Sequence, residues 1–238
     1  MSHAYYVGCY WSGRTESDTQ FAHRGAEWLC ELGRIDPSLR RWYTFKTTPQ
    51  DAVEVSPTVD TLLAKFERER SEGVGNYLAA WNGMYPPDVV LTHFKSFWMA
   101  KGFPALCMLR LYGEMGDVTT RLLHPEAMER LLRAMVRIWE PDWAVASTGD
   151  IISLYEDATG RHPECLTCGW MTYLRHPRQA IPPLPKPMRV EPVEEAGSLV
   201  VVTPEPLDAS NPAHEDLVLQ AQRILGEAEL LENPLYSR

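Results

Sequence analysis

The stretch AYYVGCYWSGRTES, residues 4–17, passes from an apolar, aromatic run into a polar turn. Its first part, residues 4–11, is mostly apolar and rich in aromatic side chains, which predicts a strand buried on both faces. Gly13 permits the turn that comes next, and Ser17 or Asp18 can cap a helix after it. We therefore expect a buried strand, a tight corner and a helix in direct succession, the first unit of a mixed α and β fold.

Four side chains around this corner are candidates for a defined role: Tyr10, Trp11, Arg14 and Glu16. We expect Arg14 to pair with Glu16 or with a carboxylate elsewhere in the sheet, while the two aromatic side chains pack beside it. The alternative is that Arg14 contacts a partner protein directly, because arginine is enriched among interface hot spots. Of the two interpretations, the sequence favours a residue that fixes the corner.

Hydrophobic periodicity predicts short strands and amphipathic helices along the rest of the chain. Helices are expected at about 18–33, from Ser56-Pro57, from His124-Pro125, over 148–160 and from Asn211-Pro212. Strands are expected at 41–46, 77–81, 89–98, 105–112, 143–147, 168–174 and 198–203. Three consecutive strands after residue 77 have no helix between them, which favours an antiparallel meander.

The segment at about 176–196 is rich in proline and lacks a periodic pattern, so we expect an extended surface segment there. The chain beyond residue 196 is too short to bury a core of its own. The sequence therefore predicts one α+β domain over residues 1–238, with a mostly antiparallel sheet and helices packed on it.

Composition limits the classes of protein to consider. Of the 238 residues, 45% are apolar and 23% are charged, which suits a globular core. No apolar run approaches the roughly 20 residues of a membrane span, and the N-terminal residues do not resemble a signal peptide. The five scattered cysteines favour reduced thiols in the cytoplasm over a disulfide framework.

The negative charge is concentrated near the C-terminus. From Met188 onward, ten acidic and three basic residues give −7, which leaves −2 of the total −9 for the rest of the chain. Such a surface repels the nucleic-acid backbone and attracts a basic partner. Ordinary solubility is the simpler interpretation of an acidic tail, and it stays open.

A metal site is the first chemical candidate. Cys165 and Cys168, with His162 and His176, provide ligand types that zinc prefers. The spacing lacks the two ligand pairs that usually enclose a structural zinc, so two buried thiols without metal are the favoured interpretation. A zinc-stabilised interaction module stays an alternative.

Motifs of catalysis are missing from the chain. HExxH, GxSxG, a Walker loop and GxGxxG do not occur, and none of the five lysines follows an acidic residue at a spacing of two. The latter pairing is common in metal-dependent nucleases. We therefore expect a binding protein without cofactor, while an enzyme with scattered carboxylates and no short motif stays an alternative.

Eight tryptophans are a high count for this length. Trp28 and Trp139 fall on apolar helix faces, and Trp81 and Trp170 lie at the ends of expected strands. An exposed tryptophan can anchor a partner. Burial is the favoured expectation, because tryptophan is highly buried on average.

The ordered set of short segments resembles a known family. YWSGRTES (10–17), AEWLCEL and IDPSLRRWY, then AAWNG (79–83), GWMTYL (169–174) and SLVVVTPEPLDASNPAH, are similar to the immunity protein 52 family of bacterial polymorphic toxin systems. The resemblance implies an antidote that binds a co-encoded toxin in the cytoplasm. It further implies a toxin of the restriction-endonuclease-like type, often delivered by type VI secretion.

The expected partner is thus a basic nuclease domain, and neither nucleic acid nor membrane is expected to bind. As the partner-binding surface we predict the acidic C-terminal segment, around Glu191, Glu194, Glu195, Glu205 and Asp208. An interface of ordinary size buries about 800 Å² on each partner, so other elements must contribute.

Overall fold

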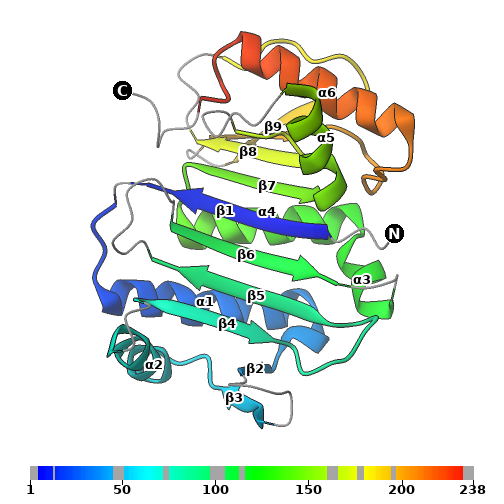
Figure 1. The fold of residues 1–238 in the computed structure, drawn as a ribbon. Coiled ribbons are helices and arrows are strands. Elements are labelled where there is room, and N and C mark those ends of the chain that lie inside the picture. Colours follow the sequence, from blue (N-terminus) through cyan, green and yellow to red (C-terminus); the bar gives the residue numbers. More distant parts are fainter. Residues whose placement is uncertain are drawn as a thin grey trace.

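One antiparallel sheet of ten strands runs through the protein, in the order β3-β2-β4-β5-β6-β1-β7-β8-β10-β9 (Figure 1). The computed structural model describes residues 5–12, 14–44, 51–71, 75–96, 105–112, 116–159, 166–175, 180–193 and 197–232, without the side chains of 155–159. The strands are β1 (Tyr5–Trp11), β2 (Trp42–Thr44), β3 (Val53–Val55), β4 (Tyr77–Trp81), β5 (Val90–Lys95), β6 (Ala105–Leu111), β7 (Trp143–Thr148), β8 (Met171–Arg175), β9 (Arg189–Val193) and β10 (Gly197–Val201). The α+β class and the antiparallel sheet predicted from sequence are confirmed.

The helices lie on the sheet in two groups. They are α1 (Asp18–Ile35), α2 (Val59–Ser71), α3 (Asp117–Leu122), α4 (Pro125–Trp139), α5 (Gly149–Thr159) and α6 (Pro212–Glu227), with a 3-10 turn, η1 (Pro37–Leu39). Figure 1 shows α1 and α4 behind the sheet, whereas α5 crosses in front of β7 and α6 lies at the β8–β9 end. Most of the core is therefore enclosed between the sheet and α1, α2 and α4.

Strand β1 is central, since it pairs with β6 on one side and β7 on the other. Alternation along a strand sends successive side chains to opposite faces. Val7, Cys9 and Trp11 accordingly join the main core, while Tyr6 and Tyr10 belong to a smaller cluster on the other face. The predicted strand, buried on both faces, is confirmed.

Helix α1 begins where the sequence predicted. Ser17 is its N-cap: the Ser17 hydroxyl accepts from the Gln20 amide at 3.2 Å, and the Gln20 side chain accepts from the Ser17 amide at 2.9 Å. This capping box satisfies two donors that a helix start leaves free. Farther along α1, the fully buried Trp28 donates its indole N–H to Thr92 of β5 at 3.0 Å.

The four tryptophans considered from sequence are all buried. Trp28 and Trp139 are 0% exposed, Trp170 is 1% exposed and Trp81 is 7% exposed. The expectation of burial is confirmed for each of them.

Three short elements escaped the sequence analysis. They are β3, α3 and β9, of three, six and five residues. Strand β9 lies inside the proline-rich segment and forms one edge of the sheet, where Pro192 is tolerated because an edge strand can lack one donor. Helix α2 begins at Val59, two residues later than Pro57 suggested, and Thr58 accepts from the Thr61 amide there.

Candidate partner-binding surfaces

The strand-to-helix corner closes over the end of helix α4. Arg14 donates through Nη1 to the Trp139 carbonyl at 2.6 Å and through Nη2 to Glu16 at 3.2 Å. Its guanidinium lies 5.0 Å from the centre of the Trp11 ring. Tyr10, by contrast, points to the opposite face of β1 and stacks on Trp143 at 4.5 Å. Only one of the two aromatic side chains expected beside Arg14 therefore packs there.

A second arginine, Arg24 of α1, was not predicted from the sequence and completes this corner. Arg24 binds Glu16 at 2.7 Å and Glu140 at 2.8 Å, and it also donates to the Ile138 carbonyl. The last carbonyls of a helix lack partners within it and carry partial negative charge, so two guanidinium groups stabilise the end of α4. The Glu16 side chain is only 8% exposed and joins both arginines. The corner is thus a set of internal contacts.

Glu191, predicted as a partner-binding residue, lies in a closed ring of ion pairs. Its carboxylate binds Arg189 at 2.5 Å and Arg133 of α4 at 2.8 Å. Glu129 binds the same two arginines at 3.2 and 2.7 Å. The hydrogen bond from Arg189, together with the charge of Arg133, lowers the pKa of Glu191. Its negative charge is therefore compensated within the protein.

The other predicted acids fall in two places. Glu194 and Glu195 lie outside the described residues. Glu205 lies before α6 with a side chain that is 72% exposed, 3.8 Å from His214. Asp208 accepts from the amide and the hydroxyl of Ser210 at 2.8 and 2.7 Å, which fixes the turn into α6. Glu205 and Asp208 both contact His214, since the Asp208 amide donates to its Nδ1 at 3.0 Å, whereas Glu191 pairs with Arg133 and Arg189.

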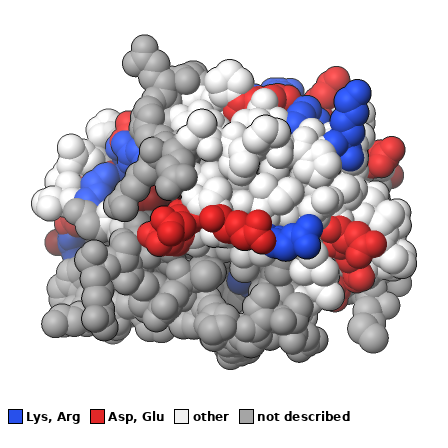
Figure 2. Space-filling view, turned by 90° about the horizontal axis from the view of Figure 1, so that it is seen from above, with Lys and Arg blue, Asp and Glu red and all other residues white. Residues whose placement is uncertain are grey.

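The excess of acidic residues continues along α6. Seven acidic residues and one basic residue, Arg223, lie between residues 197 and 232, which gives −6. We call these seven the acidic face: Glu205, Asp208, Glu215, Asp216, Glu227, Glu229 and Glu232. Seen from the α6 end, acidic side chains form a row broken by basic ones (Figure 2). Three of the seven, Glu215, Asp216 and Glu227, lie on α6 itself, and the others lie in the segments just before and just after it.

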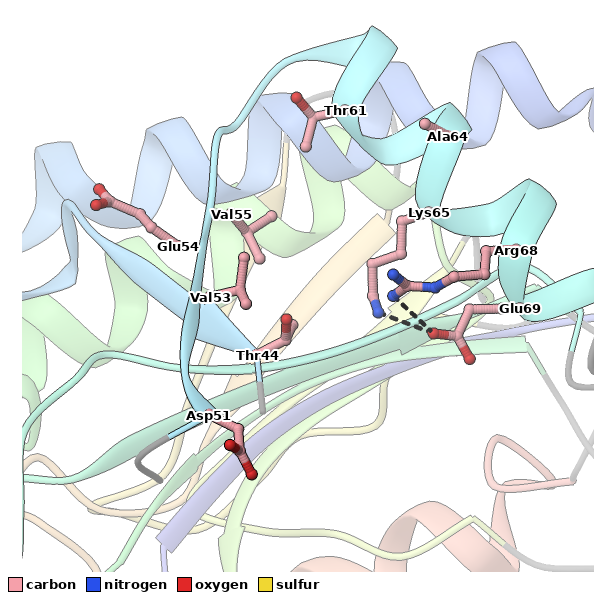
Figure 3. Close-up of a pocket in the computed structure, with 10 residues that line it drawn as sticks. All are labelled: Thr44, Asp51, Val53, Glu54, Val55, Thr61, Ala64, Lys65, Arg68 and Glu69. Carbon is pink, nitrogen blue, oxygen red and sulfur yellow. Dashed lines mark hydrogen bonds and ion pairs between the residues drawn. The ribbon is translucent and has the colours of Figure 1, made fainter. Parts of the chain in front are cut away.

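A cleft of about 570 Å³ opens between the β2–β3 hairpin and α2 (Figure 3). Its wall on α2 carries Lys65 and Arg68, whose charges converge on Glu69 at 2.8 and 3.8 Å. Across the cleft, Glu54 is paired with Arg41 at 2.5 Å. The charged residues that line the cleft thus carry both signs, so the lining does not form a uniformly positive or negative surface. Among the lining residues described, no nucleophile lies beside a base.

In the described part of the chain, the carboxylates with a shifted pKa are held by arginines. Burial alone would raise the pKa of Asp36, but hydrogen bonds from Arg121 and Ser38 lower it. The hydrogen bond from Arg41 lowers the pKa of Glu54. Both shifts favour the ionised form in an ion pair, whereas a general acid needs a raised pKa. The geometry gives the enzyme alternative no support at these residues.

The metal candidate rests mostly on residues outside the described ranges. Cys165, His162 and His176 are not described, while Cys168 is buried in the core and burial raises its pKa to about 12. Among the residues that are described, no group of three or more His, Cys, Asp or Glu side chains could hold a metal ion. No helix in the same ranges is both long and apolar enough to cross a membrane.

His93 lies on the face of the sheet opposite the main core, and its lowered pKa makes the stability of the protein depend on pH. Burial, followed by the positive charges of Arg110 and Lys95, lowers its pKa to about 4. In the unfolded chain His93 has an ordinary histidine pKa of ~6.5, so the unfolded state takes up a proton at a higher pH than the folded state does. The stability that neutral His93 contributes is thus fully present above about pH 6.5 and is lost as the pH falls toward 4.

We expect a His93→Gln protein to lose less stability than the wild type between pH 7 and pH 4.5, by about 1–3 kcal/mol. Urea unfolding at several pH values measures this difference. Parallel stability profiles for the two proteins would contradict the assignment.

Comparison with known proteins adds two findings. Residues 3–234 match immunity protein 52, which covers nearly the whole chain. Among solved structures, a type VI secretion system (T6SS) protein of Pseudomonas aeruginosa, PA0821, is similar in fold, with a TM-score of 0.56 and 14% sequence identity over 93% of this chain and 76% of that chain. No curated protein matches the chain.

Proposed function

The chain belongs to the immunity protein 52 family, and we propose that it protects the producing cell by holding a cognate toxin in a stoichiometric complex. The observation that carries this proposal is the family match over residues 3–234. The acidic face is consistent with binding a partner, because most other charged groups in the described part of the chain form ion pairs within the protein.

We further propose that the toxin is a basic nuclease of the restriction-endonuclease-like type. A nuclease presents positive charge to phosphate, and an acidic protein surface can occupy that charge. The acidic face, with seven acids against Arg223, supports this choice of partner. Because such a toxin acts on nucleic acid, its antidote acts in the cytoplasm.

The delivery route and the domain organisation complete the proposal. The similar fold of a T6SS protein supports a toxin delivered by type VI secretion. We also propose that residues 1–238 act as one domain, because a single sheet joins β1 near the start to β9 and β10 near the end.

The proposal is tested with the purified product of the adjacent gene. We expect the two proteins to copurify, and we expect its nuclease activity to fall in proportion to the added protein until about one equivalent is reached. A product that binds but attacks lipid or cell wall would contradict the nuclease assignment alone. Absence of any complex would contradict the antidote function.

A further inference from the structure

Half of the sheet presents a face that no described helix covers. Helices α1 and α4 lie behind β4, β5, β6 and β1, and α5 crosses the front at β7 (Figure 1). Strand register places one row of side chains across this front face, from β2 to β6: Tyr43, Trp81, Leu91 and Arg110. We call this surface, with Tyr85 and Lys95, the open face.

Aromatic rings run in contact across one end of the open face. The Arg41 guanidinium lies 5.5 Å from the centre of the Tyr43 ring, and Tyr43 lies 6.4 Å from Trp81. Trp81 in turn lies 5.8 Å from Tyr85, edge to face. Trp81, in the middle of this row, is only 7% exposed, whereas Tyr85 is 67% exposed and is the most exposed aromatic side chain in the described part of the chain.

The loop that carries Tyr85 is fixed from below. Asn82, 5% exposed, donates to the Asp88 carbonyl at 3.0 Å and accepts from the Val90 amide at 3.0 Å. Asp88 accepts from the Val118 amide at 2.7 Å. Gly83 has a φ of 77°, and a Cβ there would lie 2.6 Å from the Tyr43 ring, so the loop backbone rests directly on that ring. Tyr85 is thus held in place before any partner arrives, which lowers the entropy lost on binding.

Two cations on the open face have no counter-ion in the described part of the chain. Arg110 donates to the Tyr112 hydroxyl at 3.0 Å and lies 3.0 Å from the Met108 sulfur, and no ion pair joins Arg110 or Lys95 to a described carboxylate. The arginines at the corner and in the ring around Glu191, by contrast, are paired. The low pKa of His93, between these cations, agrees with an uncompensated positive field.

We propose that the open face is the surface that holds the toxin in the complex, with Tyr85 as the main anchor. Its occupant is a segment of the toxin that packs an apolar side chain against the exposed Tyr85 ring and presents a carboxylate to Arg110 and Lys95. The inference rests on the proposed function. It also assigns different roles to two surfaces, because the acidic face attracts the basic toxin and the open face retains it.

The two roles are separated by measuring association and dissociation rates with the purified product of the adjacent gene. Tyr85→Ala raises the dissociation rate about 30-fold and leaves the association rate and its salt dependence unchanged, since anchors act mainly after encounter. The matched control is Val53→Ala, because Val53 is 63% exposed and points to the other face of the sheet. We expect this control to change neither rate more than about twofold.

A second variant tests the cations. Arg110→Gln raises the dissociation rate about tenfold, as expected for loss of a charge-assisted contact. If Tyr85→Ala and Arg110→Gln both leave dissociation within about twofold of the wild type, the open face is not the anchoring surface, while the antidote function stands. If the wild type itself forms no complex, the proposed function has failed as well.

Discussion

Glu16→Gln should lower the free energy of unfolding by about 3 kcal/mol, and Arg14→Ala by about 2 kcal/mol. Glu16 is nearly buried and accepts from both Arg14 and Arg24, so loss of its charge leaves two guanidinium groups at the end of α4 with only the 55% exposed Glu140 as a counter-ion. Removing one partner of a buried pair costs roughly 3–5 kcal/mol, and the lower figures allow for arginine side chains that are 21% and 23% exposed.

Chemical denaturation measures these losses. The matched control is Arg34→Ala, which breaks an exposed pair with Glu31 within α1 and should cost less than about 0.5 kcal/mol. The folded Arg14→Ala protein should bind the toxin as the wild type does. If the protein is fully stable but unable to bind, Arg14 is a contact residue and the corner assignment is wrong.

The corner also shows how far sequence reasoning reaches. The strand, the cap at Ser17 and the helix follow from local pattern, because each depends on neighbours within a few residues. Arg24 and the end of α4 could not be predicted as their partners, because the contact between Arg24 and Ile138 joins residues 114 positions apart. The short elements β3, α3 and β9 carry too few residues to show a period.

Contacts between residues far apart in the sequence also decide which of the predicted partner-binding acids stay exposed. Glu191 and Glu205 look alike in the sequence, since both lie in an acidic, proline-containing stretch. The fold places Glu191 against Arg133 of α4, 58 residues away, whereas Glu205 stays exposed. Charge counting located the acidic region correctly along the chain but could not separate compensated acids from uncompensated ones. Helical placement of Asp216 and Glu227 then extends the acidic face beyond the residues first chosen.

Reversal of exposed charges on the acidic face should therefore have the largest effect on toxin affinity. We expect a protein with Glu205→Lys, Asp216→Lys and Glu227→Lys to bind about 100-fold more weakly at low salt, with most of the change in the association rate. All three side chains are exposed, so the fold should persist. The matched control reverses three exposed acids on α2 and α4, Asp60, Glu67 and Glu126, for the same change in net charge.

The comparison of these two triple variants isolates position from total charge. If attraction depended on net charge alone, both proteins would lose affinity equally. An effect confined to the α6 variant, and reduced at high salt because ions screen exposed charges, places the basic surface of the toxin near α6. Affinity and salt dependence that match the wild type in the α6 variant would show that the acidic face serves solubility, and the whole interface would then have to lie elsewhere.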